Sequence, residues 1–165
     1  MGEDLLRFTG WITNSAAFIQ VFVFDEKNNI LGDIPLCIDT GACSTCLFER
    51  DAVNLGIDYS KLKRARPAIG IGGRADAYEL KNVKLGLIGG DDRGYLASFD
   101  SMMVIVPQKN LKGKIVGLIH HLLGSKGSSY AQSSRGLPSL LGFDFLRTCK
   151  ISFSNNEVYL DREIA

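Results

Sequence analysis

The sequence has almost no net charge, because 19 basic and 18 acidic residues leave a formal charge of +1. A chain without an excess of either sign has no overall field that draws it to nucleic acid or to an acidic membrane surface. It also has no apolar run near the roughly 20 residues that a membrane-spanning helix needs. We therefore expect no nucleic-acid partner and no membrane partner.

Residues that bind metals are scarce and poorly spaced. The only two histidines, His120 and His121, are adjacent, and Cys43 and Cys46 form a single Cys-x-x-Cys. A structural zinc site of four thiolates needs a second such pair. The pattern favours reduced structural thiols and no metal. A zinc or thiol-redox site built on Cys43 and Cys46 remains a minor alternative.

The one local concentration of charge is a basic cluster formed by Lys61, Lys63, Arg64 and Arg66. Charged side chains are typical of an edge strand, where they discourage pairing with another chain. The cluster therefore predicts a solvated edge, and a patch for an acidic substrate or nucleic acid is the less favoured alternative.

The first nine residues carry Glu3 and Asp4 and no apolar run, unlike a secretory signal. With free thiols, this indicates a cytoplasmic protein. A length of 165 residues suits one domain with a real core, and no shift in composition marks a second. We expect a single domain over residues 1–165.

Short segments rich in β-branched and aromatic residues follow one another along the chain, with turn residues between them. Many short strands indicate an all-β sandwich or barrel. Strands are predicted at residues 18–24, 34–39, 67–71, 75–80, 83–88, 101–106, 150–153 and 157–160, and a strand running into a short helical turn at 44–55.

One segment departs from the β pattern. Residues 114–123 have apolar side chains at helical spacing, and Gly124 follows as a C-cap. Residues 124–136 are rich in Gly and Ser and are predicted to form a mobile loop. Together they make up an insertion at about 108–136.

Asp39 lies in the most informative stretch, Leu-Cys-Ile-Asp-Thr-Gly-Ala at residues 36–42. An acid at the end of a buried strand is costly unless donors compensate its charge. The hydroxyl of Thr40 and the N–H groups of a tight turn at Gly41 are such donors, and Gly41 allows a close approach. Taken alone, the stretch slightly favours an ordinary turn-capping aspartate.

Two further features follow along the chain. The first is a hairpin tip at residues 70–73, Gly-Ile-Gly-Gly, whose glycines allow it to move, although a plain tight turn is an alternative. The second is Leu140-Leu141-Gly142-Phe143-Asp144, an apolar pair and a glycine before a short helix that starts at Asp144.

In this order, the three features resemble the retropepsins, the retroviral-type aspartic peptidases. The resemblance runs from about residue 18 to residue 160. It implies a closed all-β barrel with a short C-terminal helix, to which this chain adds the helical insertion. It implies that Asp39 is the catalytic acid, that Thr40 locks two active-site loops together and that Gly41 holds the loop. The substrate would be bound by Ala42, Gly70, Ile71, Gly72 and Gly73.

Hydrolysis by this route places a water between two carboxyl groups, one ionised and one protonated. The chain has no second Asp-Thr-Gly and no Asp-Ser-Gly, so one copy cannot supply both acids. A two-fold homodimer can, because its axis places Asp39 opposite Asp39. The prediction is an aspartic endopeptidase without cofactor, cutting extended peptides. The alternative is a non-catalytic peptide-binding or dimerisation module on the same fold.

Overall fold

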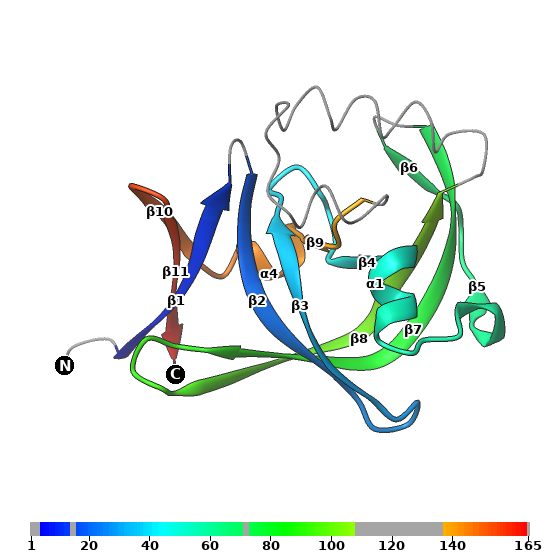
Figure 1. Ribbon diagram of the computed structural model, residues 1–165, viewed down its shortest axis with the longest axis horizontal. Coiled ribbons are helices and arrows are strands. Elements are labelled where there is room, and N and C mark those ends of the chain that lie inside the picture. The colour runs from blue at the N-terminus through cyan, green and yellow to red at the C-terminus, as the bar shows by residue number, and fades with distance from the viewer. Residues whose placement is uncertain (1–3, 14–15, 71–72, 108–136, 165) are drawn as a thin grey trace.

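A computed structural model describes residues 4–13, 16–70, 73–107 and 137–164, and its long sheet curls into a nearly closed ring (Figure 1). The strands are β1 (Asp4–Thr13), β2 (Ala16–Asp25), β3 (Ile30–Ile38), β4 (Cys46–Phe48), β5 (Lys63–Arg64), β6 (Ala68–Gly70), β7 (Gly73–Ile88), β8 (Gly94–Pro107), β9 (Leu140–Leu141), β10 (Lys150–Ser154) and β11 (Glu157–Ile164). The helical segments are α1 (Glu49–Asn54), the 3₁₀ turn η1 (Tyr59–Lys61) and α4 (Phe143–Leu146).

Strand order explains the ring. The strands follow one another as β10-β11-β1-β2-β3-β9-β4-β8-β7-β5, and β6 pairs with β7. An additional pairing of β2 with β7 connects the middle of this order to its end. In the described sheet, β3 with β9 and β4 with β8 are parallel pairs, and the other pairings are antiparallel.

The core lies inside the ring because alternate residues of each strand face it. In β2, Ile19, Val21 and Val23 are at most 2% exposed, while Gln20 between them is exposed. Leu36, Leu85 and Leu141 of other strands join the same cluster. The fold is therefore mostly β with short helices, as the strand-rich sequence predicts.

Most predicted strands are present, with four differences. Residues 4–13 form β1, which was not predicted, and residues 94–100 belong to β8 rather than to a connection. The predicted strands 75–80 and 83–88 are one strand, β7, which continues past Asn82 at a positive φ of 57°. β3 begins at Ile30 and ends one residue before Asp39.

Two smaller predictions are confirmed. β5 lies at the end of the strand order with Lys63 and Arg64 exposed, as predicted for a basic edge strand. The helix α4 is the predicted short C-terminal helix, although it begins at Phe143 rather than Asp144. The predicted helix at 114–123 and loop at 124–136 lie outside the described residues. Within the described part, no helix is long and apolar enough to cross a membrane.

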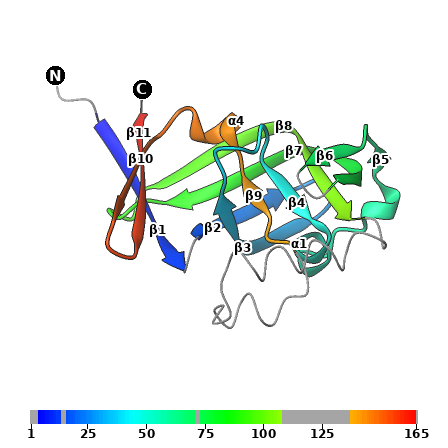
Figure 2. The ribbon, with the colours of Figure 1, turned by 90° about the horizontal axis from the view of Figure 1, so that it is seen from above.

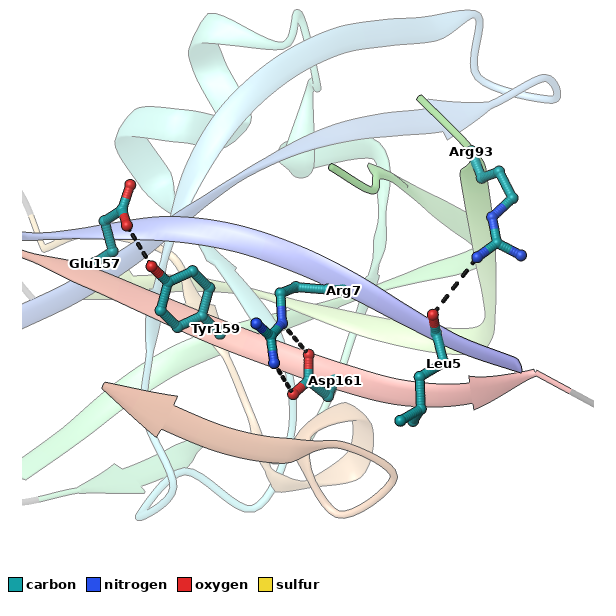
Figure 3. Close-up of polar contacts among 6 residues, drawn as sticks. All are labelled: Leu5, Arg7, Arg93, Glu157, Tyr159 and Asp161. Carbon is teal, nitrogen blue, oxygen red and sulfur yellow. Dashed lines mark hydrogen bonds and ion pairs between the residues drawn. The ribbon is translucent and has the colours of Figure 1, made fainter. Parts of the chain in front are cut away.

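A bidentate ion pair joins β1 to the last strand of the chain (Figure 3). Arg7 and Asp161 are register partners of β1 and β11, and Arg7 donates to Asp161 from Nε at 2.6 Å and from a terminal nitrogen at 2.7 Å. The guanidinium also lies 5.0 Å from the ring centroid of Tyr159. The hydrogen bond from Arg7 lowers the pKa of Asp161.

This pair should make stability depend on pH. Because the folded pKa of Asp161 is depressed, its contribution is present above the unfolded carboxyl pKa of about 4 and is lost as the pH falls through the folded value. We expect Arg7→Met to lower the melting temperature near neutral pH, and the difference from wild type to shrink in strong acid. Arg74→Met, which removes an exposed charge from β7, is the control. Equal differences at both pH values would contradict the assignment.

Candidate active site

Asp39 is the first residue after β3, and its side chain is half-buried. The chain turns at once, and the N–H of Gly41 donates to Asp39 Oδ1 at 2.8 Å. The N–H of Ala42 donates to the Asp39 carbonyl at 3.2 Å. A backbone donor of the tight turn therefore compensates the carboxylate, as predicted for Gly41, while the side chain of Thr40 is exposed.

The strand β9 lies beside β3, the strand that ends just before Asp39 (Figure 2). It lies parallel to β3, with Leu141 opposite Ile38. The N–H of Cys37 donates to the Ser139 carbonyl at 2.8 Å, and that of Asp39 donates to the Leu141 carbonyl at 3.1 Å. Two motifs that lie a hundred residues apart in the chain are thus brought side by side.

Gly142 marks the crossing of β9 over the segment that follows Asp39. A Cβ at this position would lie 2.3 Å from the carbonyl carbon of Ser44 and 2.7 Å from the nitrogen of Thr45. Real Cβ atoms do not approach backbone this closely, so only glycine fits here. The N–H of Gly142 also donates to Thr45 Oγ1 at 3.0 Å.

Asp144 has a role that the sequence analysis missed. Its carboxylate accepts the N–H of Thr45, at 2.9 Å to each oxygen, and the Thr45 hydroxyl at 2.7 Å. Next to it, the N–H of Phe143 donates to the Ala42 carbonyl at 2.8 Å. The start of α4 is therefore bonded to the Asp39 loop at two points. The sign of this role in the sequence is that Asp144 is an acid two residues after Gly142.

A second missed element is the buried carboxylate of Asp51 in α1, whose side chain is 2% exposed. Ser139 donates to it from Oγ at 2.6 Å and from its N–H at 3.2 Å, and Arg50 donates from Nε at 2.7 Å. The Ser139 hydroxyl in turn accepts the N–H of Phe48 at 2.9 Å. This network fastens the residue before β9 to α1.

An apolar surface lies on the same face of the sheet as Asp39. Residues i and i+2 of a strand face the same side, so Cys37 and its register partner Leu140 share the side of Asp39. Leu140 is in turn the partner of Cys46. Leu140 and Cys46 belong to a second cluster, separate from the main core, whose members are Cys46, Phe48, Ala65, Ala68, Ala75, Ala77, Met103, Ile105 and Leu140.

The predicted hairpin is present, and it contributes to this surface. Gly70 of β6 and Gly73 of β7 are paired at its end, and Ala68 and Ala75 of its two strands are members of the cluster. The tip residues Ile71 and Gly72 lie outside the described residues. The hairpin and the Asp39 loop thus border one apolar surface.

The thiols near the site are kept protonated. Burial raises the pKa of Cys46 to about 12, and burial with the nearby negative charge of Asp39 raises that of Cys37 to about 11. Thiols of this kind are weak nucleophiles and weak metal ligands at neutral pH. Among the described residues no group of three metal-ligating side chains forms, and His120 and His121 lie outside them.

No protein-family model matches the sequence, and no curated protein matches it either. Several solved structures are similar to it, including the following two. One is a retropepsin-like aspartic protease from Rickettsia conorii, with a TM-score of 0.51 and 20% identity, covering 100% of this chain and 98% of that chain. The other is the retroviral protease-like domain of Ddi1 from Leishmania major, with a TM-score of 0.42 and 14% identity, covering 93% and 96%. Together with the order of strands around Asp39, the first match shows that this chain has the retropepsin-like fold.

Proposed function

We propose that the protein is an aspartic endopeptidase that acts as a homodimer, with Asp39 of each copy forming the catalytic pair. The observation that carries the proposal is the Asp39 carboxylate. It stands at the end of β3, accepts the N–H of Gly41 and lies on a loop supported from β9 and α4, in the retropepsin-like fold. The loop that carries this acid is anchored from β9 and from α4, which is more support than an aspartate that only caps a turn requires.

Pairing is proposed because one copy has one such acid. The sequence holds a single Asp-Thr-Gly, and a two-fold axis beside the loop would bring Asp39 of both copies together. In the single chain Thr40 and Gly41 are exposed, so this loop is open to a partner. We assign Thr40 the role of locking the two loops together.

The proposed chemistry uses the pair asymmetrically. Two carboxyl groups about 3 Å apart cannot both be ionised, so they hold one proton between them. The ionised Asp39 takes a proton from a water as that water attacks the peptide carbonyl. The protonated Asp39 of the other copy donates to the carbonyl oxygen.

The substrate is proposed to be an extended peptide lying between the Asp39 loop and the β6–β7 hairpin. Extended peptides bind by adding a strand, through main-chain hydrogen bonds. The residues proposed to make these bonds are Ala42, Gly70, Ile71, Gly72 and Gly73. The partly exposed members of the apolar cluster beside Asp39, such as Leu140 and Met103, would contact an apolar side chain next to the cleaved bond.

The pH dependence of cleavage tests this proposal. We expect the purified protein to cut peptides from a mixed library fastest on the acidic side, with the rate falling as the pair loses its last shared proton. Chelators and thiol-blocking reagents should leave the rate unchanged. A rate that is flat from mildly acid to alkaline pH would contradict the carboxyl pair. Binding of peptides without cleavage at any pH would favour the non-catalytic module.

A further inference from the structure

We propose that Asp144 is a positioning residue for Asp39, acting through Thr45. The inference rests on the proposed function, because it assigns Asp144 to the support of that same site. The carboxylate of Asp144 does not touch the reacting atoms. Its role would be to fix the position of the loop between Asp39 and Thr45.

The loop is held at both of its ends. At its start, the N–H of Asp39 donates to the Leu141 carbonyl at 3.1 Å. At its end, Thr45 is 1% exposed, and both its N–H and its hydroxyl donate to Asp144. The residues between, including the exposed Thr40 and Gly41, have no strand pairing of their own.

The Thr45 hydroxyl connects Asp144 to Gly142 through hydrogen bonds. A hydroxyl has one proton and two lone pairs. Because the proton goes to Asp144 Oδ1 at 2.7 Å, the oxygen is left to accept the N–H of Gly142 at 3.0 Å. Gly142 follows Leu141, whose carbonyl holds Asp39. A short chain of contacts therefore runs from Asp144 through Thr45, Gly142 and Leu141 to the backbone N–H of Asp39.

Asp144 is itself held in place. The N–H of Phe145 donates to its Oδ1 at 2.9 Å, so the carboxylate is fixed to the first turn of α4. Hydrogen bonds to an ionised acceptor are stronger than neutral ones, particularly where water is partly excluded. The acid therefore gives the loop a stiffer support than a neutral side chain would.

The test compares Asp144→Ala with a matched variant, Asp25→Ala. Asp25 is 2% exposed and also anchors a turn, accepting the N–H of Asn28 at 3.1 Å and its side-chain amide at 2.6 Å. It lies beyond the opposite end of β3 from Asp39. We expect Asp144→Ala to lower kcat about 100-fold with little change in KM, since small misplacements of reacting groups cost this much. Asp25→Ala should lower the melting temperature. Its kcat should equal that of wild type at temperatures at which the variant is still folded.

Two variants of Thr45 complete the comparison. Thr45→Ser keeps the hydroxyl and should keep most of kcat, whereas Thr45→Val removes it and should resemble Asp144→Ala. Equal losses of kcat in Asp144→Ala and Asp25→Ala would overturn the inference, because both variants would then act through stability alone.

Amide hydrogen exchange separates this inference from the proposed function. The N–H of Gly41 is bonded to Asp39 Oδ1, so its exchange reports on the loop without any substrate. It should quicken about tenfold or more in Asp144→Ala and stay unchanged in Asp25→Ala. If wild type cleaves nothing, the proposed function fails and this exchange alone decides on the positioning. Unchanged exchange at Gly41 in Asp144→Ala would overturn it.

Discussion

Asp39→Asn should abolish peptide cleavage while the chain stays folded and paired. The amide keeps the shape of the carboxylate and can still accept the N–H of Gly41, but it cannot take a proton from water. Loss of general acid–base catalysis costs about 100- to 10,000-fold in rate. Cleavage of a reporter peptide measures this effect, and sedimentation measures the mass of both forms.

Asp33→Asn is the matched control for this variant. Asp33 lies on β3, the strand that leads to Asp39, and it is exposed. It accepts a hydrogen bond from the Gln20 amide at 2.8 Å. The same chemical change there should leave cleavage intact. Normal cleavage by Asp39→Asn would end the proposed function.

Mixing the two forms tests the pairing itself. If each active unit needs Asp39 from two copies, then an excess of Asp39→Asn chain should inhibit wild type as the copies exchange. In an equal mixture only about a quarter of the pairs would hold two intact acids. Activity that simply follows the amount of wild-type chain would show that a single copy suffices.

Gly142→Ala should have the largest effect on stability. The added Cβ would lie 2.3 Å from the carbonyl carbon of Ser44 and 2.6 Å from its oxygen, and these backbone atoms cannot rotate away. The crossing of β9 over the Asp39 loop would have to open. We expect a loss of about 3 kcal/mol or more in the free energy of unfolding. This is a large part of the total stability of an ordinary domain.

Chemical denaturation measures this loss, with Gly94→Ala as the control. Gly94 begins β8, and no atom lies within 4 Å of a Cβ placed there. This control should therefore unfold within about 1 kcal/mol of wild type. A Gly142→Ala chain as stable as the control would contradict this prediction, because it would show that the backbone at the crossing can move apart to accept a Cβ.

The sequence predicted those elements of the fold that are determined by residues close together in the chain. The hairpins at 67–80 and 150–160 and the turn after Asp39 follow from local alternation and from glycines, and they are present. β1 was missed because it is defined by pairing with β11 at the other end of the chain. Its alternation of buried Leu6 and Phe8 was the only local sign.

The contacts that support the candidate site could not be predicted from the sequence, for the same reason. The contacts of Asp51 with Ser139 and of Thr45 with Asp144 join residues 88 and 99 positions apart. A single sequence shows an aspartate in a helix and another after a glycine, and neither reveals its partner. The motif around Asp39 could be identified, whereas the residues that hold it in place required the fold.

The parallel pairing of β3 with β9 has a consequence for when the candidate active site forms during synthesis. Contacts between distant parts of a chain form late, because a large loop must close first. During synthesis, Asp39 emerges about a hundred residues before the strand that holds its backbone. A growing chain should therefore acquire its hairpins early and its ordered Asp39 loop only after residue 145 is free to fold. The candidate catalytic acid would lack its ordered loop until β9 and α4 have been synthesised.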